Sequence, residues 1–286
     1  MGATGQLGRE ICKQLGPAAL PLLREQVDLR RPEEFLRVLE RERPQSLINC
    51  AGWTAVDDAE RFPTECLAIN ATAIQELVAA CNSLDIHLVQ VSTDYVFGAD
   101  SNRTVPYEEV DVPGPINTYG ESKLAGEVAA AKANKHLIVR TCGLYTAGKQ
   151  GPVRGRNFAD TMLVLGEGTN ILRVVSDQVC TPSFVPHVAK GILDLLSLQK
   201  IGLFHIVNSG ATTWHNFASE LLHRARLKTV VHAITSNEYP TLANRPKYSV
   251  LSSNKFSTAV EYSLPNWQDG IREYIKASTL SHTDLA

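Results

Sequence analysis

The chain has 286 residues, of which 44% are hydrophobic and 20% charged, and its 28 Lys and Arg residues against 30 Asp and Glu give a formal net charge of −2. This length is enough for one large doubly wound domain with a smaller appendage. The near balance of charge argues against nucleic-acid and acidic-membrane binding, and the apolar runs are too short for a membrane span, with no secretory leader before the first motif.

The cysteine pattern predicts a reducing, cytoplasmic setting. None of the six cysteines forms a Cys-x-x-Cys pair, and several lie in apolar stretches where a thiol behaves as a small buried hydrophobe. We therefore expect neither a disulfide framework nor a metal site.

Three glycines open the chain, at Gly2, Gly5 and Gly8, and lead into a predicted helix over residues 6–15. This Gly-x-x-Gly-x-x-Gly spacing allows a tight turn and a close approach to a pyrophosphate, and the helix N-terminus offers free N–H groups. Such a turn normally follows a strand, which the chain lacks before Gly2. We expect the missing strand to lie upstream of Met1. The alternative is a sheet without its central strand.

Residues 18–23 are a short apolar run that we predict to be the second strand. Arg24 follows this run, and an arginine there can accept a ribose phosphate, which favours NADPH over NADH. An equally good interpretation is that Arg24 and Glu25 are solvated loop charges. Asp28 is a candidate contact for the adenine.

Strands and helices alternate from here to about residue 145. We predict helices over 32–43, 63–83 and 119–132 and strands over 47–51, 87–93 and 136–140. The small residues at 51–54 would let a cofactor approach the backbone, and Asn70 is either exposed or reaches back to hold the loop after the glycine turn. This alternation predicts an α/β fold with a Rossmann-like doubly wound parallel sheet over residues 1–145.

Tyr119 and Lys123 lie four residues apart on one predicted helix, so both side chains point the same way. A tyrosine normally titrates near ~10, and a lysine charge beside it stabilises the phenolate and lowers the pKa. The pair is a candidate acid/base device for carbonyl/alcohol interconversion. Thr93 ends a buried strand, where ligands bind in open α/β sheets, and we expect it to face the same crevice.

Residues 146–286 are predicted to be mainly substrate-binding, with about 183–210 returning to the Rossmann-like domain. The basic, glycine-rich segment 148–156 is either a loop that closes over an anionic ligand or an ordinary surface loop. Arg245 and Lys247 place two cations near a potential anionic ligand. The small residues of the Tyr119 helix, such as Gly126 and Ala129, permit close helix packing, either within the fold or across a homodimer.

Taken together, these features resemble the extended short-chain dehydrogenase/reductase family, and within it the 4-keto-sugar reductases of dTDP-rhamnose biosynthesis. The matching segments run over nearly the whole chain: the glycine turn at 2–8, then 49–57, 92–97, 106–109, 119–127, 157–158, 177–179, and 245–246 with Ser249 and Leu251. The resemblance implies NAD(P)H-dependent reduction of a 4-keto nucleotide sugar.

The resemblance also implies roles for individual residues. Tyr119 would protonate the alkoxide, Lys123 would lower the tyrosine pKa and hold the nicotinamide ribose, and Thr93 would bond the substrate carbonyl region. The implied contacts to NADPH or NADH are Gly2, Thr4, Gly5, Gln6, Leu7, Gly8, Asp28, Leu29, Ala51, Gly52, Thr54, Asn70, Tyr119 and Lys123. The implied contacts to the nucleotide-sugar substrate are Thr93, Asp94, Val96, Asn157, Gln178 and Arg245.

One departure concerns the substrate pocket. The family usually has a tryptophan after the strand that ends at Thr141, whereas this chain has Gly143. Gly143 is expected to leave a larger and less apolar pocket.

Two alternative functions remain. The first is a non-catalytic, NADP-binding regulatory subunit similar to that of S-adenosylmethionine synthetase, but a pure scaffold has no need of Thr93, Tyr119 and Lys123 together. The second is a sugar-nucleotide epimerase or dehydratase. A dehydratase needs an acid next to its active-site hydroxyl, and strand alternation predicts that Asp94 points away from the face of Thr93.

Overall fold

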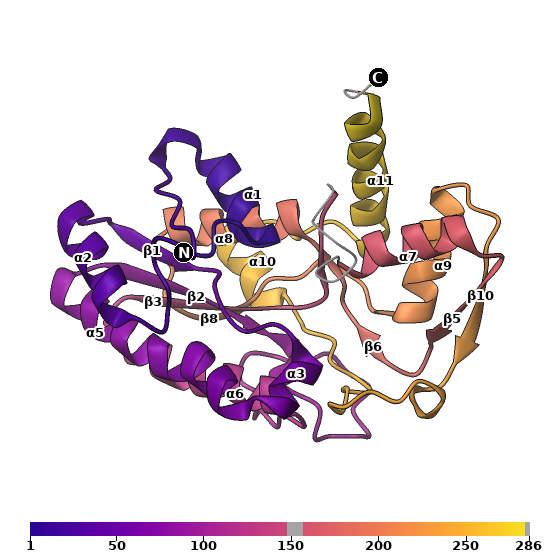
Figure 1. Ribbon diagram of the computed structural model, residues 1–286, viewed down its shortest axis with the longest axis horizontal. Helices are drawn as coiled ribbons and strands as arrows, with labels where there is room; N and C mark the ends of the chain where they lie inside the picture. Colours follow the sequence, from indigo (N-terminus) through magenta and orange to yellow (C-terminus); the bar gives the residue numbers. More distant parts are fainter. Residues whose placement is uncertain (148–156, 284–286) are drawn as a thin grey trace.

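A parallel sheet organises the first half of the chain in the computed structural model, which describes residues 1–147 and 157–283 (Figure 1). Within the described residues this sheet has four strands, in the spatial order β1 (Ser46–Asn49), β2 (His87–Thr93), β3 (His136–Thr141) and β8 (Gly202–His205). Each strand is parallel to its neighbours. Parallel strands covered on both faces have continuous apolar runs, as β2 and β3 do.

Helices cover both faces of this sheet (Figure 1). The helices on one face are α1 (Gln6–Leu15), α8 (Val185–Ser197) and α10 (Asn254–Val260), and those on the other are α2 (Pro32–Glu42), α5 (Ala73–Leu84) and α6 (Thr118–Ala130). Successive strand residues point to opposite faces, so Leu88 packs with α2 and α5 and Val89 packs with α1 and α8. This is the doubly wound arrangement predicted from the sequence.

The predicted strand at residues 18–23 is wrong, because a short 3-10 helix (Gly16–Ala18) and irregular backbone occupy this segment. A long backbone hydrogen bond connects this segment to the start of the chain, with Ala3 N–H donating to Leu22 O at 3.4 Å. A cavity of about 140 Å³ lies between this segment and the outer edge of β1. On that edge the Met1 ammonium donates to Ile48 O at 2.7 Å, and Met1 O accepts from Cys50 N at 3.2 Å. A strand needs a neighbour that continues its ladder, and residues 18–23 have none in the described structure.

The predicted helix at 63–83 is interrupted. It consists of α4 (Pro63–Leu67), a π-helical turn (Ala68–Thr72) and α5, and the unpredicted α3 (Val56–Arg61) precedes it. The π turn carries Asn70, whose carbonyl oxygen would lie 2.1 Å from a Cβ on Gly126 of α6. Close helix packing at Gly126 therefore occurs within the fold, which was one of the two alternatives for the small residues of α6.

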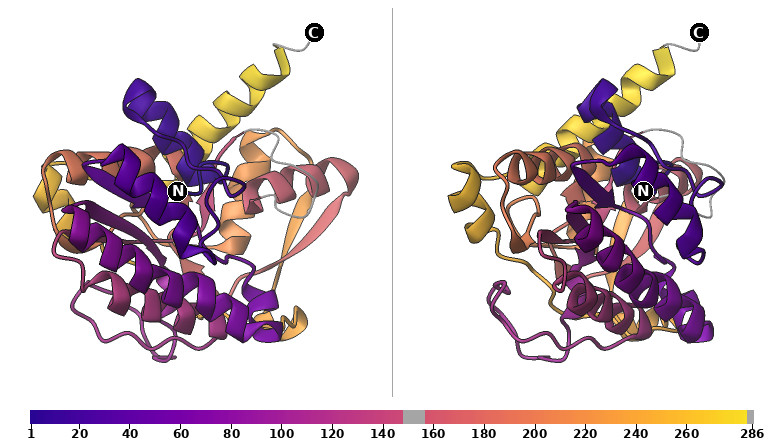
Figure 2. Two further views of the ribbon diagram at one scale, coloured as in Figure 1. Left: turned by 60° about the vertical axis from the view of Figure 1, so that its left-hand side comes forward. Right: turned by 90° about the vertical axis from the view of Figure 1, so that its left-hand side faces the viewer.

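A smaller part of the molecule lies beside the sheet (Figures 1 and 2). Helices α7 (Phe158–Gly168), α9 (Trp214–Arg224) and α11 (Trp267–Thr283) pack with the parallel pair β5 (Ile171–Val175) and β10 (Val230–Ile234) around Phe217 and Tyr145. The end of α11 projects beyond the rest of the molecule (Figure 2). None of the described helices is both long and apolar enough to cross a membrane. The basic segment 148–156 lies outside the described residues.

Two short strand pairs join the two parts. The pair β4 (Leu144–Tyr145) and β7 (Ser183–Phe184) is parallel, and the pair β6 (Val179–Cys180) and β9 (Thr212–Thr213) is antiparallel. β6 and β9 bring Cys180 and the start of α9 next to the ends of the central strands. This placement builds one wall of the site.

Candidate active site

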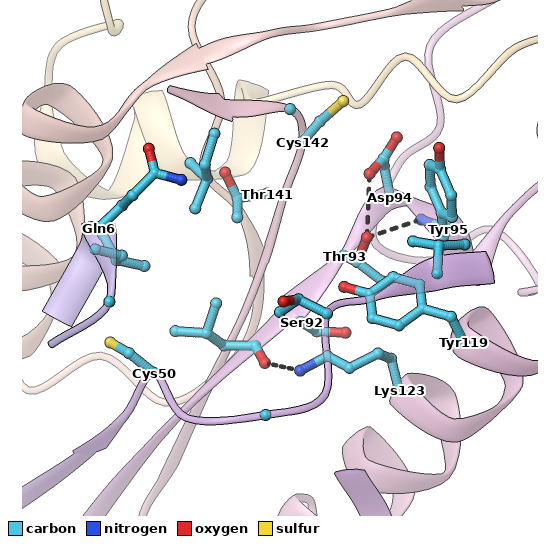
Figure 3. A pocket seen from close by; sticks show the side chains of 18 of the residues that line it. Gln6, Cys50, Ser92, Thr93, Asp94, Tyr95, Tyr119, Lys123, Thr141 and Cys142 are labelled. Atoms are coloured by element: carbon cyan, nitrogen blue, oxygen red, sulfur yellow. Dashed lines mark hydrogen bonds between the residues drawn. The ribbon is translucent and has the colours of Figure 1, made fainter. Parts of the chain in front are cut away.

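A cavity of about 640 Å³ lies at the carboxyl ends of β1, β2 and β3, where ligands bind in open α/β sheets. In Figure 3, Gln6 and Cys50 lie on one side of it and Tyr95 and Tyr119 on the other. The sequence-predicted residues that line it are Thr4, Gly5, Gln6, Leu7, Gly8, Ala51, Gly52, Thr54, Thr93, Asp94, Tyr119, Lys123 and Gln178. One cavity thus brings together most of the predicted cofactor and substrate residues.

Helix α6 delivers the Tyr119 phenol to the cavity from a firmly held N-terminus. The Asn117 side chain caps this helix by accepting a hydrogen bond from Gly120 N at 2.8 Å. A Cβ on Gly120 would lie 2.2 Å from Tyr95 O, so only glycine lets the first turn of α6 approach this closely. Tyr95 also packs edge-on against Tyr119, with ring centroids 5.8 Å apart.

The Tyr119 phenol does not have the lowered pKa that the sequence predicted. Burial raises the pKa of Tyr119, and a hydrogen bond from Thr93 opposes that rise only in part. The Lys123 ammonium donates to Val91 O at 2.6 Å (Figure 3), and burial lowers the pKa of Lys123 to about 8. The expected lowering is not found, because burial is the largest influence on the Tyr119 pKa and the Asp94 carboxyl raises it further. The phenol is protonated at neutral pH.

The Asp94 carboxyl shares the cavity with the Thr93 hydroxyl, which contradicts the expected alternation. Thr93 Oγ1 donates to Asp94 Oδ1 at 3.1 Å and accepts from Tyr95 N at 3.2 Å. β2 ends at Thr93, and residues 94–96 form a 3-10 turn, so the two-residue period of a strand no longer applies. Ser249 Oγ donates to Asp94 Oδ2 at 2.6 Å, and burial raises the Asp94 pKa although these hydrogen bonds oppose it.

The glycine turn forms the other end of the cavity. Gly5 is the N-cap of α1 and supplies no side-chain cap, so the amides of the first turn face the cavity without a side-chain acceptor. A Cβ on Gly8 would lie 2.2 Å from Gly2 O, and a Cβ on Gly2, which has φ +72°, would lie 2.7 Å from Ala51 N. Both positions therefore require glycine. Gly2 supports the turn from behind and does not line the cavity.

Three other predicted cofactor residues lie away from the cavity wall. The Asp28 carboxylate is held by Arg30 at 2.5 Å, and this hydrogen bond lowers the Asp28 pKa to about 2. Leu29 is buried in the core. Asn70 accepts from Trp53 N at 2.8 Å and donates to Trp53 O and to Ser122, so it holds the loop after β1 rather than the loop after the glycine turn. Direct contact of these residues with a cofactor stays a prediction.

Some of the predicted substrate residues line the cavity and others lie away from it. Gln178 lines the cavity, with its Nε2 donating to Ser236 Oγ at 2.9 Å. Val96 is fully buried in the core, where a substrate cannot reach it without rearrangement. Asn157 caps α7 and donates to Gln6 Oε1 at 3.1 Å, and Arg245 pairs with Asp57 at 2.9 Å beside the cavity. Asn157 and Arg245 do not line it.

Gly143, which the sequence placed at the substrate pocket, lines the cavity. Several other lining residues were not predicted, namely Cys50, Val56, Val91, Ser92, Tyr95, Thr141, Cys142, Leu144, Cys180, Trp214, Pro246 and Ser249. Ser249 lies in a segment that carried the family resemblance, so the sequence contained a pattern that could have placed it at the site. No sequence pattern placed Trp214 there, because its approach to the cavity depends on tertiary packing. The larger pocket expected at Gly143 is not present, because Trp214 Cη2 would lie 2.9 Å from a Cβ placed there.

Comparisons with known proteins agree with this geometry. The family model "RmlD substrate binding domain" matches residues 1–280. The dTDP-4-dehydrorhamnose reductase of Salmonella typhimurium is 35% identical over 96% of this chain and 95% of its own length. Crystal structures of the dTDP-4-dehydrorhamnose reductases of Clostridium acetobutylicum (TM-score 0.89, 35% identity) and of Bacillus anthracis in complex with NADP (TM-score 0.90, 33% identity) each cover 96% of both chains.

Proposed function

The chain belongs to the RmlD substrate binding domain family, and from this premise we propose that it is an NADPH-dependent reductase of dTDP-4-dehydrorhamnose, acting in dTDP-rhamnose biosynthesis. The single observation that carries the proposal is the convergence of Thr93, Tyr119 and Lys123 on one cavity that also contains the glycine turn. The Bacillus anthracis relative was solved with NADP, which agrees with the preference for NADPH drawn from Arg24.

The residues at the glycine turn fit a dinucleotide. The uncapped first turn of α1 can accept a pyrophosphate, and a Cβ at Gly8 would close the backbone cradle that the turn forms. Thr4, Gln6, Ala51 and Gly52 would hold the cofactor along the same wall. When bound, the nicotinamide supplies the hydride for the carbonyl carbon, so the protein contributes positioning and a proton.

Tyr119 is the proton donor in this mechanism. Its phenol is protonated at neutral pH, since a tyrosine ordinarily titrates near ~10 and burial raises this pKa further, and a protonated group is the state that an acid needs when a ketone becomes an alcohol. The Thr93 hydroxyl lines the same cavity and donates to Asp94 Oδ1 at 3.1 Å. Lys123 is anchored through Val91 O at 2.6 Å and lines the same cavity, which supports a role in holding the nicotinamide ribose.

Replacement of Tyr119 by Phe tests this assignment. The Tyr119→Phe variant should lose turnover by roughly 10²–10⁴-fold, the scale of general acid catalysis, while it still binds NADPH. Turnover is followed by NADPH oxidation with dTDP-4-dehydrorhamnose, and binding by fluorescence titration. Tyr95→Phe is the matched control, since Tyr95 is the other phenol in the cavity. Full turnover by the Tyr119→Phe protein would show that another group donates the proton.

The position of Asp94 favours one second candidate, a dehydratase. An acid directly beside the Thr93 hydroxyl is what a dehydratase needs, although Asp94 already accepts from Thr93 and Ser249. The two reactions differ in stoichiometry, because a reductase consumes one NADPH per product and a dehydratase or epimerase returns its cofactor unchanged. A non-catalytic subunit would consume none, and the assembled Thr93, Tyr119 and Lys123 argue against it.

Two further properties stay proposals. All six cysteines are free thiols, which supports the predicted reducing, cytoplasmic setting. We also propose a nucleotide sugar as the binding partner in the cavity. A homodimer remains a prediction from the sequence, and the packing of Gly126 against Asn70 accounts for one small residue of α6 inside the fold.

A further inference from the structure

Trp214 and Gly143 form a stretch of the cavity wall that the mechanism above does not use. Trp214 is the first residue of α9, and Thr213 fixes its place by capping this helix, accepting from Asn216 N at 3.1 Å. Gly143 follows β3 by two residues, and Thr141 of β3 is the ladder partner of Thr93. The indole therefore lies on the wall that continues from the catalytic threonine.

Gly143 determines where the indole can lie. Gly143 has φ +50°, a conformation that favours glycine. A Cβ there would lie 2.9 Å from Trp214 Cη2 and 3.2 Å from Pro182 Cα, so any larger residue would displace the ring or the backbone. The indole also packs against Phe158, with ring centroids 4.6 Å apart and ring planes tilted by 54°. Gly143 and Phe158 therefore both contact the ring and fix its position.

The indole has unused binding capacity. Trp214 is half-buried and lines the cavity. Within residues 1–147 and 157–283, its Nε1–H donates no hydrogen bond to another protein group. Tyrosine and tryptophan side chains with a partly exposed polar end favour ligands that present an apolar face beside a hydroxyl. Sugar rings combine C–H faces with hydroxyl groups in this way.

We propose that the Trp214 indole is the surface on which the sugar ring of the substrate packs, with Gly143 setting the position of the indole. This inference rests on the proposed function, because it names the sugar subsite of the same cavity. Trp214 and Gly143 are then specificity-determining residues, which select for a sugar that presents an apolar face next to the carbonyl held by Thr93 and Tyr119.

A binding experiment tests the subsite without catalysis. The unreactive probe dTDP-glucose should quench tryptophan fluorescence more than dTDP does, because only the former carries a sugar to the indole. That difference should vanish in Trp214→Phe and persist in Trp53→Phe, whose indole donates to Ala55 O away from the cavity lining. Equal quenching by the two probes, or a difference that survives in Trp214→Phe, would overturn the proposal.

A kinetic experiment separates the subsite from the catalytic machinery. Trp214→Leu should raise KM for the 4-keto nucleotide sugar by roughly three- to tenfold, the worth of one aromatic contact, and leave KM for NADPH unchanged. Phe158→Leu is the matched control, because Phe158 supports the indole without lining the cavity. An equal rise of KM in both variants would show a merely structural effect and overturn the proposal.

A wild-type protein that binds dTDP-glucose through Trp214 but oxidises no NADPH would contradict the proposed function and support this subsite.

Discussion

The buried ion pair between Arg140 and Glu127 yields a sharp prediction about stability. Arg140 Nη2 lies 2.7 Å from Glu127 Oε2 and Arg140 Nε lies 2.9 Å from Oε1, and their side chains are only 3% and 7% exposed. Ser92 donates to the same carboxylate at 2.5 Å. Burial lowers the pKa of His205 to about 3, so the imidazole beside Arg140 is neutral and does not compete for the charge. The pair ties α6, which carries Tyr119 and Lys123, to β3.

Arg140→Met should destabilise the protein by about 3–5 kcal/mol, because it leaves the Glu127 carboxylate buried without a cation. With a urea dependence of roughly 1–3 kcal/mol per M, the unfolding midpoint falls by at least about 1 M. The double variant Arg140→Met/Glu127→Leu should lose less stability than Arg140→Met alone, because it removes the stranded charge as well. Urea unfolding followed by circular dichroism measures all three proteins.

An exposed ion pair provides the control. Lys135 and Asp85 are 2.6 Å apart but 50% and 78% exposed, so Lys135→Met should cost no more than about 1 kcal/mol. If the Arg140→Met protein were as stable as the Lys135→Met protein, burial would not be setting the energy of the pair. If the double variant were less stable than Arg140→Met, the stranded carboxylate would not be the cause of the loss.

Two further predictions concern the cavity. Burial lowers the Lys123 pKa from its ordinary 10.5 to about 8, so the unfolded chain binds more protons than the folded protein between these pH values. The stability of the wild type relative to Lys123→Met should therefore rise by up to about 3 kcal/mol as the pH goes from 8 to 10.5. A stability difference that stays constant across this range, measured by thermal or urea unfolding, would refute the burial of a charged lysine. Gly8→Ala should weaken NADPH binding by roughly tenfold or more in a fluorescence titration, because the added methyl would lie 2.2 Å from Gly2 O and overpacking costs about 1–3 kcal/mol. Gly168→Ala is the control and should bind NADPH normally, because a Cβ at Gly168 has no neighbour within 4 Å.

The parts of the fold that depend on local sequence were predictable. α1 spans Gln6–Leu15 as expected, and α6 spans Thr118–Ala130 where a helix over 119–132 was predicted. The residue types that cap and propagate a helix act within a few positions of one another, so their pattern is legible in the sequence. The alternation of strands and helices likewise predicted the parallel sheet.

The errors came from features that local sequence does not determine. Residues 18–23 are apolar enough for a strand, but a strand also needs a neighbour with a continuous ladder. Asp94 was assigned to the wrong face because strand alternation was carried one residue past the end of β2, where the chain enters a 3-10 turn. Asn70 holds Trp53 instead of the glycine turn because a π turn redirects it. The contact between Gly143 and Trp214 joins residues 71 positions apart (214 − 143), which no local pattern records.

Burial has opposite effects on the pKa values of the two ionisable groups of α6, Tyr119 and Lys123, and this sets their protonation states at neutral pH. It raises the pKa of Tyr119, so the phenol keeps its proton, and it lowers the pKa of Lys123 to about 8, so the ammonium is mostly retained at neutral pH. A protonated phenol next to a cation is ready to give a proton to a new alkoxide and badly placed to remove one from an alcohol. These protonation states are the ones from which ketone reduction starts, whereas the net direction of the reaction is set by the concentrations of cofactor and substrate.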